Sequence, residues 1–451
     1  MGLGVFSGGV EPARYFAERG HAVTVTDLGD EDRLQTSINA LRDLPVRLVL
    51  GEHREADFTE TDLLVVSPAV KDSNSYLELA RRRGVALTTE INLVFEQCPA
   101  PILGITGSNG KTTTTRLLGD MLQNHDPASL VGGNIGKSVL NEIGSLPSES
   151  LAVLELSSFQ LHRLTWIGAS PHISIVTNLS PNHLDWHATF EAYVTAKRKI
   201  LEYQTEGDFA ILNADDPLLS DWDTHTRGRA IWFGMNIGDR LGAFVKDGVI
   251  VYRSNGSERE VVSLADLFVP GSHNVSNALA AVTGAVVANV PIHCIQKAIR
   301  GFRGVAHRLE YVTDHDGVRF YNDSACTTPD SSLTALKAFD EPIVLIAGGY
   351  DKGIPFDELA RECVQSARAV VLIGDTAAEL NRAITTVDSG RGPEVVCCSS
   401  MEDAVATSQI LAHSGDVVLL SPACASYDMF ENFEARGSAF KAAVGKLKCS
   451  V

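Results

Sequence analysis

A glycine-rich loop that ends in a lysine and two threonines is the strongest chemical signal in the sequence. Glycines let backbone N–H groups turn toward phosphate oxygens, a lysine ammonium can meet β- and γ-phosphates, and a threonine hydroxyl can meet Mg²⁺. The loop is a shortened form of the G-x-x-x-x-G-K-[ST] pattern, because Ile105 stands at the first glycine. An apolar run before it and an amphipathic stretch after it favour nucleotide binding over a plain helix-capping turn. The loop residues are Gly107, Ser108, Asn109, Gly110, Lys111, Thr112 and Thr113.

An acidic residue and two histidines downstream of this loop are candidate metal ligands. Glu155 follows a short apolar run, which places its carboxylate at the end of a predicted strand, although such a residue alone is more often solvated. His183 and His187 flank Asp185 after another such run. Histidines four residues apart suit zinc on a helix, but Pro181 favours a loop here. We therefore expect Mg²⁺ with His183 as one ligand.

Three further polar residues have both a structural and a functional interpretation. Lys197 begins a Lys-Arg-Lys run that is typical of a basic, solvated helix face. Asn274 stands at the start of an apolar helix, where it or Ser272 can cap the helix, and where an asparagine can also bind an adenine edge. Arg308 follows a histidine at the passage into the last third of the chain. It can reach phosphates across a cleft between domains, or it can be structural.

The first residues have features of a dinucleotide-binding turn. Gly2 and Gly4 precede further glycines and a predicted helix, and Asp27 closes the next strand, where such folds place a ribose-binding acid. The strand that should come before the turn is missing, because Met1 directly precedes the glycines. This favours an internal or truncated start and predicts a first sheet without its central member. A plain glycine-rich loop is the alternative.

The elements around these residues alternate as in α/β proteins. A length of 451 residues corresponds to about three domains, and the proline-rich residues 98–101 mark a break between two of them. We expect parallel sheets and domains at residues 1–97, 98–303 and 304–451. Apolar runs predict strands at residues 22–26, 47–50, 63–66, 102–106, 151–154, 173–177, 209–212, 343–347, 370–373 and 417–420. Helices are predicted at residues 76–83, 190–203, 274–288, 356–365, 377–384 and 401–412, and a hairpin turn at residues 246–249.

Composition argues against several classes of protein. The chain has 38 Lys+Arg against 56 Asp+Glu, and a formal charge of -18 repels nucleic acid. No apolar stretch is long enough to cross a bilayer, and residues 1–10 lack the basic region of a secretory signal. The 8 cysteines form no C-x-x-C pair, which suits a reducing compartment. We expect a cytoplasmic protein without nucleic-acid partners or membrane insertion.

Together the motifs resemble the Mur ligase family, the ATP-dependent amino-acid ligases of peptidoglycan assembly. The resemblance implies a three-domain α/β fold, with a Rossmann-like N-terminal domain, a central P-loop ATPase-like domain and a C-terminal Rossmann-like domain. Within the family, residues 155–161, 348–353 and 421–426 with Phe433 favour the addition of D-glutamate to UDP-N-acetylmuramoyl-L-alanine through an acyl phosphate. The whole resemblance covers essentially all of the chain and is carried by residues 107–113, 132–136, 155–161, 182–183, 193–197, 271–277, 307–308, 322–324 and 419–426.

The same resemblance implies a role for each candidate residue. Lys197 aligns with a lysine that is carbamylated in the family. The catalytic residues would be Lys111, Glu155, His183 and Lys197, and the Mg²⁺ ligands Thr112, Glu155, His183 and Lys197. ATP would be contacted by residues 107–113 with Asn274, Arg308 and Asp323, and the UDP-substrate by Asn134 and Gln160, with Asp27 at the uridine. D-glutamate would be bound by Thr327, Lys352, Ser426 and Phe433.

Two positions depart from the family pattern. Ala325 replaces a usual lysine, which removes a positive charge and predicts either weaker D-glutamate binding or a compensating cation elsewhere. Ala306 replaces a proline before the His-Arg pair, a smaller change. The alternatives are a related ligase that adds L-alanine, a third-position amino acid or glutamate to folate, an NAD-dependent oxidoreductase, and a non-catalytic nucleotide-binding regulator. We expect a monomer.

Overall fold

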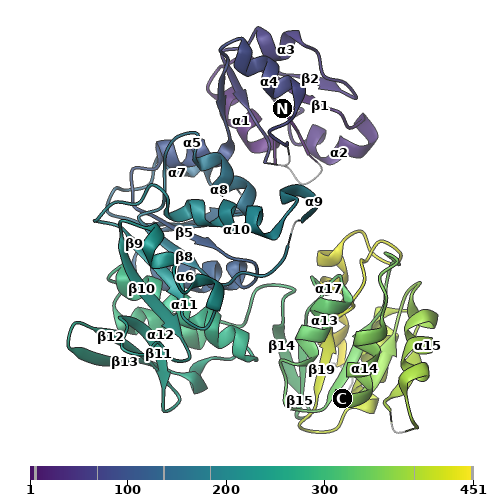
Figure 1. Cartoon of the computed structure of the whole chain (residues 1–451). Coiled ribbons are helices and arrows are strands. Elements are labelled where there is room, and N and C mark those ends of the chain that lie inside the picture. The colour runs from purple at the N-terminus through teal and green to yellow at the C-terminus, as the bar shows by residue number, and fades with distance from the viewer. Residues whose placement is uncertain (5–7, 69, 136–137, 183, 391, 448–451) are drawn as a thin grey trace. The chain divides into compact units, whose positions relative to one another are not determined.

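The computed structural model describes residues 1–4, 8–68, 70–135, 138–182, 184–390 and 392–447. Helices alternate with mostly parallel strands along most of the chain (Figure 1), so the predicted α/β class is confirmed. The chain forms two compact units, one of Met1–Leu264 with Ser276–Ala298 and one of Ala265–Val275 with Ile299–Val451. The sequence-derived boundaries of three domains stay a prediction.

Two short parallel pairs of strands, β1 with β2 and β3 with β4, begin the first unit. The backbone of Met1 and Gly2 is hydrogen-bonded to both pairs: Gly2 N donates to Thr26 O (2.9 Å), and Met1 N donates to Val65 O (2.9 Å). Met1 and Gly2 belong to no strand, and the two pairs form separate two-stranded sheets, so the expectation of a first sheet without its central member stays a prediction. The elements are α1 (Val10–Glu18), β1 (Val23–Asp27), α2 (Glu31–Asn39), β2 (Val46–Leu50), α3 (Ala56–Thr59), β3 (Leu63–Val65), α4 (Ser75–Arg82), β4 (Ala86–Thr88) and α5 (Glu90–Gln97).

A nine-stranded sheet in the order β13-β12-β11-β10-β9-β8-β5-β7-β6 forms the centre of the first unit. Its strands run parallel from β6 to β11, and β12 and β13 continue it as antiparallel strands. The strands are β5 (Ile102–Thr106), β6 (Leu130–Gly133), β7 (Ala152–Glu155), β8 (Ile173–Val176), β9 (Phe209–Asn213), β10 (Arg229–Gly234), β11 (Gly242–Lys246), β12 (Val249–Ser254) and β13 (Ser257–Ser263). The helices are α6 (Lys111–His125), α7 (Leu140–Ile143), α8 (Ser158–Leu164), α9 (Leu184–His187), α10 (Phe190–Arg198), α11 (Ser272–Val287) and α12 (Ile292–Gly301).

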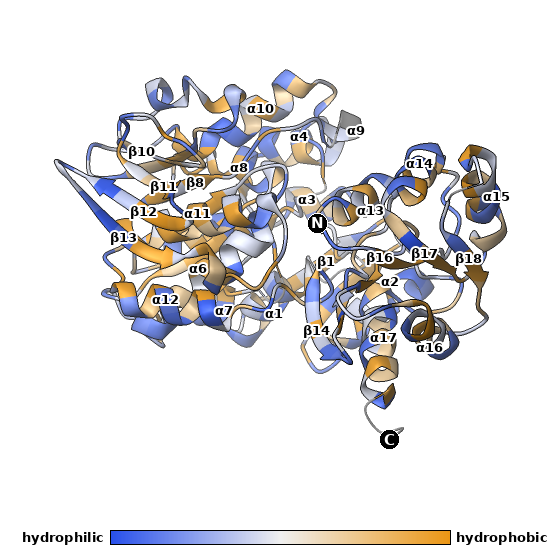
Figure 2. Ribbon diagram, turned by 90° about the horizontal axis from the view of Figure 1, so that it is seen from below, coloured by the Kyte–Doolittle hydropathy of each residue, from blue (hydrophilic) through white to orange (hydrophobic). Residues whose placement is uncertain are grey.

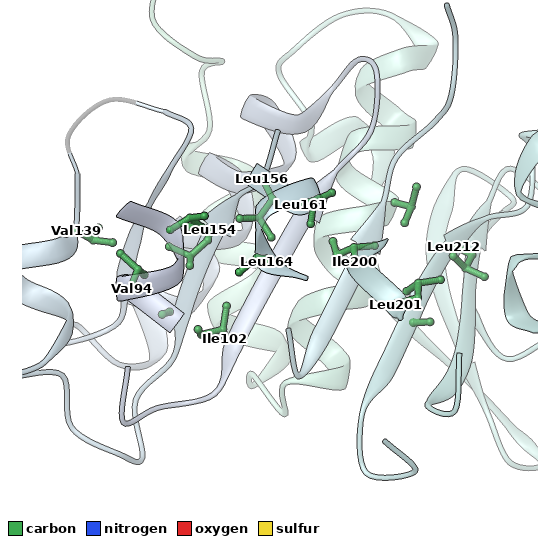
Figure 3. Close-up of a cluster of buried hydrophobic side chains, with 14 of the residues drawn as sticks. Val94, Ile102, Val139, Leu154, Leu156, Leu161, Leu164, Ile200, Leu201 and Leu212 are labelled. Carbon is green, nitrogen blue, oxygen red and sulfur yellow. The ribbon is translucent and has the colours of Figure 1, made fainter. Parts of the chain in front are cut away.

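The strands of this sheet that carry the glycine loop are buried on both faces. All five residues of β5 and all four of β7 and β8 are buried, as expected of parallel strands covered by helices. On one face, Ile102 and Leu154 pack with Leu161 of α8 and with Ile200 just after α10 (Figure 3). This packing fixes the ends of β5, β7 and β8 against one another.

The second unit contains a six-stranded sheet in the order β14-β15-β19-β16-β17-β18. All neighbouring pairs are parallel except β14 with β15, which form an antiparallel hairpin. The strands are β14 (Glu310–His315), β15 (Val318–Asn322), β16 (Ile343–Ala347), β17 (Ala367–Leu372), β18 (Glu394–Cys397) and β19 (Val417–Leu420). The helices are α13 (Pro329–Leu336), α14 (Asp357–Ser366), α15 (Ala377–Val387), α16 (Met401–Leu411) and α17 (Phe433–Leu447).

Helices cover both faces of this second sheet. Leu345 of β16 packs with residues of α13, α14 and α15, whereas its neighbour Val344 packs with residues of α16 and α17. Successive side chains of a strand point to opposite faces, so β16 needs apolar residues throughout, and Figure 2 shows the hydrophobic colour along β16 and β17. The carboxyl ends of β15, β16 and β19 consequently share one edge, where open α/β sheets bind ligands.

Most of the predicted elements are found, with bounds that differ by a few residues. Ile102–Thr106, Ile343–Ala347 and Val417–Leu420 are strands over the predicted residues, and the turn at residues 246–249 joins β11 to β12 with positive φ at Asp247 and Gly248. Sequence analysis missed β6, β10, β15 and β18, and it missed β14, whose mixed polar and apolar residues lie at the edge of the sheet. No helix among the described residues is long and apolar enough to cross a membrane.

Candidate active site

The glycine loop joins β5 to α6, as predicted. Gly107 and Gly110 have φ of 145° and 79°, which side chains rarely adopt. A Cβ atom on Gly107 would lie 1.9 Å from Thr177 Oγ1, and one on Gly110 would lie 2.1 Å from Asn277 Oδ1. The Lys111 ammonium donates to Gly107 O (3.0 Å) and Ser108 O (2.9 Å), so its charge lies over the loop. Backbone and lysine together form a cradle for phosphate groups.

The chain just after β8 holds this loop in place, and sequence analysis missed it. Asn178 Oδ1 accepts a hydrogen bond from Asn109 N (2.9 Å), and Asn178 Nδ2 donates to Asn109 O (3.1 Å). Thr177 Oγ1 also donates to Asn109 O (2.6 Å), and Ser108 Oγ donates to Ser180 O (2.9 Å). The polar residues 177–180, which follow an apolar run, could have indicated this contact. The ends of parallel strands meet at one edge of a sheet, so polar residues after one strand can contact the loop after another.

Glu155 lies at the end of β7, beside the start of α6. It is only 2% exposed, so the interpretation as a solvated edge residue is wrong. Its Oε2 accepts a hydrogen bond from Thr112 Oγ1 (2.8 Å), and its Oε1 accepts one from Asn134 Nδ2 (3.2 Å). Mg²⁺ prefers one or two carboxylates with hydroxyl, water and phosphate oxygens, and Thr112 with Glu155 fits that set.

Lys197 is buried under the loop, so the prediction of a basic, solvated face is wrong for this residue. Its side chain is 1% exposed, and Nζ donates to Gly107 O (2.7 Å) and Thr106 Oγ1 (3.3 Å). Burial lowers the pKa of the Lys197 ammonium well below its usual value, the nearby Lys111 lowers it further, and Glu155 opposes both. Tyr193 and Lys197 lie one helical turn apart in α10, so they share a face of the helix. The apolar ring of Tyr193 at this spacing could have indicated that the face of Lys197 is buried.

The histidine segment differs from the predicted loop. His183 lies outside the described residues, and α9 (Leu184–His187) follows it as a single helical turn. His187 is 8% exposed, its Nε2 is 2.9 Å from Ser158 Oγ, and its ring stacks on Phe159. Among the described residues, no group of three or more His, Cys, Asp or Glu side chains could hold a metal ion.

The three candidate residues for the UDP-substrate make local contacts in the first unit. Asn134 bonds to Glu155, and Gln160 closes a capping box with Ser157 at the start of α8. The Asp27 carboxylate accepts hydrogen bonds from Leu3 N (2.7 Å), Gly4 N (3.1 Å) and Gly29 N (2.8 Å). The Asp27 carboxylate therefore holds the backbone of Leu3 and Gly4 in place, and its contact with uridine stays a prediction.

Asn274, Arg308 and Asp323, the remaining ATP candidates, belong to the second unit. α11 begins at Ser272, so Asn274 lies within its first turn and is not an N-cap; its amide donates to Pro270 O (2.7 Å). Asp323 is 8% exposed and accepts hydrogen bonds from Leu309 N (3.2 Å) and Ser421 Oγ (2.9 Å). Burial raises the pKa of Asp323 to about 6, although these hydrogen bonds and the charge of Arg308 lower it.

The four D-glutamate candidates lie on chain segments beyond the carboxyl ends of β15, β16 and β19. Lys352 Nζ donates to Thr327 O (3.3 Å), which brings two of them together. Ser426 is buried, and Phe433 begins α17, where its backbone oxygen accepts a hydrogen bond from Ser324 Oγ (2.8 Å). All four positions are consistent with residues that line a small-molecule site at this edge of the sheet.

A buried arginine that sequence analysis missed connects these segments. Arg436 is 1% exposed and donates to Ser324 O (2.9 Å), Ser324 Oγ (3.1 Å) and Ala425 O (3.0 Å). Burial lowers the pKa of Arg436 to about 10. Its position in a helix of ordinary composition gave no signal. Arg436 is a cation close to Ala325, where the usual lysine is absent.

The fold and this geometry define a nucleotide-binding α/β protein with a phosphate loop, a strand-end acid beside it and a second, mostly parallel sheet. Family models match three consecutive segments: "Mur ligase MurD-like, N-terminal domain" at residues 1–89, "Mur ligase middle domain" at 105–285 and "Mur ligase, glutamate ligase domain" at 307–424. The chain belongs to the Mur ligase family.

Full-length relatives support the same membership. The chain is 43% identical over 453 residues to a "UDP-N-acetylmuramoylalanine--D-glutamate ligase" of Roseiflexus sp. (strain RS-1), covering 98% of this chain and 96% of that protein. It is 42% identical over 436 residues to a protein of the same name from Symbiobacterium thermophilum, covering 96% and 95%. The fold is also that of UDP-N-acetylmuramate-alanine ligase MurC from Thermotoga maritima, with a TM-score of 0.59, 22% identity and coverage of 98% of each chain.

Proposed function

We propose that this protein is an ATP-dependent, ADP-forming ligase that joins D-glutamate to UDP-N-acetylmuramoyl-L-alanine in peptidoglycan precursor synthesis. The relatives that carry this activity in their names match nearly the whole chain at about 40% identity. The observation that carries the proposal is the Thr112–Glu155 contact next to the Lys111 ammonium, because phosphoryl transfer needs a cation site and a positive charge at one loop.

The reaction needs two steps that the site residues can serve. The γ-phosphoryl group of ATP passes to the L-alanine carboxylate, which gives an acyl phosphate and ADP. The D-glutamate amine then attacks the acyl carbon, loses a proton, and displaces inorganic phosphate as the amide forms. Lys111 and the loop N–H groups stabilise charge on the transferring phosphoryl group. When bound at Thr112 and Glu155, with His183 as a third proposed ligand, Mg²⁺ would supply further charge neutralisation.

Lys197 is proposed to carry a carbamate. A neutral amine can attack CO₂, so that a C–N bond forms and one proton is released, and the lowered pKa of buried Lys197 favours that neutral form. The product is a carboxylate in place of a neutral amine, which adds a second acidic oxygen ligand near Glu155. After incubation with ¹³C-bicarbonate, wild type should show a carbamate carbon signal that Lys197→Met lacks. Equal spectra of the two proteins would contradict the carbamate.

Substrate contacts complete the proposal. Asn274, Arg308 and Asp323 are proposed to bind ATP, and Asn134, Gln160 and Asp27 the UDP-substrate. Thr327, Lys352, Ser426 and Phe433 are proposed to bind D-glutamate, with Lys352 paired to one of its carboxylates. We propose that the protein acts in the cytoplasm, where ATP and UDP-sugars are available, and that it acts as a monomer.

The test is phosphate release with Mg·ATP, UDP-N-acetylmuramoyl-L-alanine and a series of amino acids. Release that depends on D-glutamate, with a product heavier by one glutamyl residue, is the expected result. Glu155→Gln should lower the rate by about a hundredfold or more, while Glu149→Gln, an exposed acid six residues earlier, should leave it unchanged. Release with another amino acid, or none with any, would reject the D-glutamate assignment.

A further inference from the structure

The chain segment that carries Arg308 has an unusual backbone. His307 and Leu309, on either side of Arg308, have φ of 64° and 42°, a left-handed region that non-glycine residues rarely adopt. Such conformations persist only where surrounding contacts determine them, and they concentrate at functional sites. The exposed Arg308 side chain projects from this turn, so whatever fixes the turn also fixes the direction of the guanidinium.

One carboxylate makes several of the contacts that fix this turn. Glu310 Oε2 accepts hydrogen bonds from His307 N (2.9 Å) and from Asn322 Nδ2 (2.9 Å). Glu310 Oε1 accepts one from Lys441 Nζ (2.9 Å), which lies on α17. Glu310 therefore connects the turn to the end of β15 and to the C-terminal helix. Burial raises the pKa of Glu310, but the hydrogen bonds from His307 N and Lys441 outweigh this effect and leave it below its usual value.

The His307 side chain is held by the same group of residues. Its Nδ1 is 3.0 Å from Asn322 Nδ2, the nitrogen that also reaches Glu310. Gly437 of α17 lies against the ring, since a Cβ atom there would be 2.1 Å from His307 Nδ1. Burial, and next the Lys441 charge, lower the pKa of His307, which keeps the imidazole neutral and able to accept from Asn322. Ring and backbone of His307 are thus both fixed.

We propose that Glu310 is a positioning residue for nucleotide binding: it holds the left-handed turn at residues 307–309 and thereby directs Arg308 toward the phosphates of ATP. This inference rests on the proposed contact of Arg308 with ATP. Glu310 itself does not touch the nucleotide. Its effect passes through the backbone of His307, so it should vanish when the arginine side chain is absent.

The test compares Glu310→Gln, Arg308→Ala and the double variant in the ligation assay. Glu310→Gln keeps the shape but removes the charge and one acceptor, and we expect the KM for Mg·ATP to rise about tenfold. The KM values for D-glutamate and the UDP-substrate should change less than about twofold. The double variant should bind ATP no more weakly than Arg308→Ala alone, because Glu310 acts through that side chain.

Glu341→Gln is the matched control, since Glu341 pairs with Arg319 (2.6 Å) elsewhere in the same unit. It should lower stability slightly and leave the KM for ATP unchanged. Lys441→Met is the second variant if Glu310→Gln does not fold, and it should raise the KM for ATP in the same direction. Multiplicative effects in the double variant, an unchanged KM for ATP, or equal rises in all three KM values would overturn the proposal.

Binding of a fluorescent ATP analogue separates this inference from the proposed function. If wild type forms no D-glutamyl product but Glu310→Gln still weakens analogue binding through Arg308, the positioning role stands and the substrate assignment fails. If wild type is an active D-glutamate ligase and Glu310→Gln binds the analogue as wild type does, only the positioning role fails.

Discussion

Burial changes what several charged side chains can do in this protein. Glu155, Lys197 and Arg436 are 2%, 1% and 1% exposed, although all three are residue types that normally face solvent. Each has hydrogen-bond partners that offset the cost of its burial. A buried side chain whose hydrogen-bond partners are fixed keeps its orientation. A fixed orientation suits groups that contact a phosphoryl group or that hold the segments around a ligand in place.

Asp323 gives a pH-dependent prediction. Its pKa is raised from 3.8 to about 6 in the folded protein, so between these values the folded state binds more protons than the unfolded state. The contribution of Asp323 to the free energy of unfolding should therefore fall as pH rises through this window, by about 3 kcal/mol in total, and stay level above it. Urea unfolding of wild type and Asp323→Asn from pH 4 to pH 7 measures this difference. A difference between the two proteins that does not vary with pH would contradict the raised pKa.

Ala325 gives a prediction about D-glutamate binding. Two cations bond to the backbone of neighbouring residues, Arg436 to Ser324 O and Lys352 to Thr327 O, but neither occupies the side-chain position of residue 325. Ala325→Lys should lower the KM for D-glutamate by up to about fivefold, as an exposed ion pair allows. Ala325→Met, with similar length and no charge, should not. If the lysine variant gains neither rate nor affinity, the absent charge does not limit binding.

At the scale of elements, the phosphate loop depends on two neighbours that are distant in sequence. The end of β8 bonds to Ser108 and Asn109, and Asn277 of α11 occupies the space that a side chain on Gly110 would need. The loop shape is therefore set by β5, β8 and α11 together. Glycine at position 110 is required both for its φ and for this close approach.

Gly110→Ala tests this dependence. The substitution should lower the free energy of unfolding by about 1–3 kcal/mol and weaken ATP binding at least about tenfold, because both the backbone and Asn277 must shift. Gly238→Ala is the control: Gly238 also has positive φ, but a Cβ atom added there would meet nothing within 4 Å. It should lose only about 1 kcal/mol of stability and bind ATP normally. Thermal unfolding measures the loss of stability in both variants, and titration with an ATP analogue measures their nucleotide affinity.

At the scale of the whole molecule, the candidate ATP residues are divided between the two units. Lys111 and Thr112 belong to the first, and Asn274, Arg308 and Asp323 to the second. We expect Lys111→Met in the first unit and Arg308→Ala in the second each to weaken binding of a fluorescent ATP analogue at least about tenfold. A variant that binds the analogue as wild type does would remove its residue from the proposed ATP contacts.

The amino-acid sequence by itself determined the local part of this description. A buried apolar run, two glycines and a lysine predict the strand, loop and helix at residues 102–125, since dihedral freedom and hydrophobic periodicity act over a few residues. Glu155 was placed at a strand end for the same reason. The parallel sheets followed from the alternation of short apolar runs and amphipathic stretches.

Only the tertiary structure decided which distant residues meet. Lys197 reaches Gly107 O across 90 positions, Asn178 holds Asn109, and Arg436 joins segments at Ser324 and Ala425. In the first unit, the strand order β9-β8-β5-β7 places the ends of β5, β7 and β8 side by side. That order results from packing summed over the whole core. Spacing along the chain carries no record of such packing, so Lys197 looked solvated, while the structure shows it buried beneath the phosphate loop.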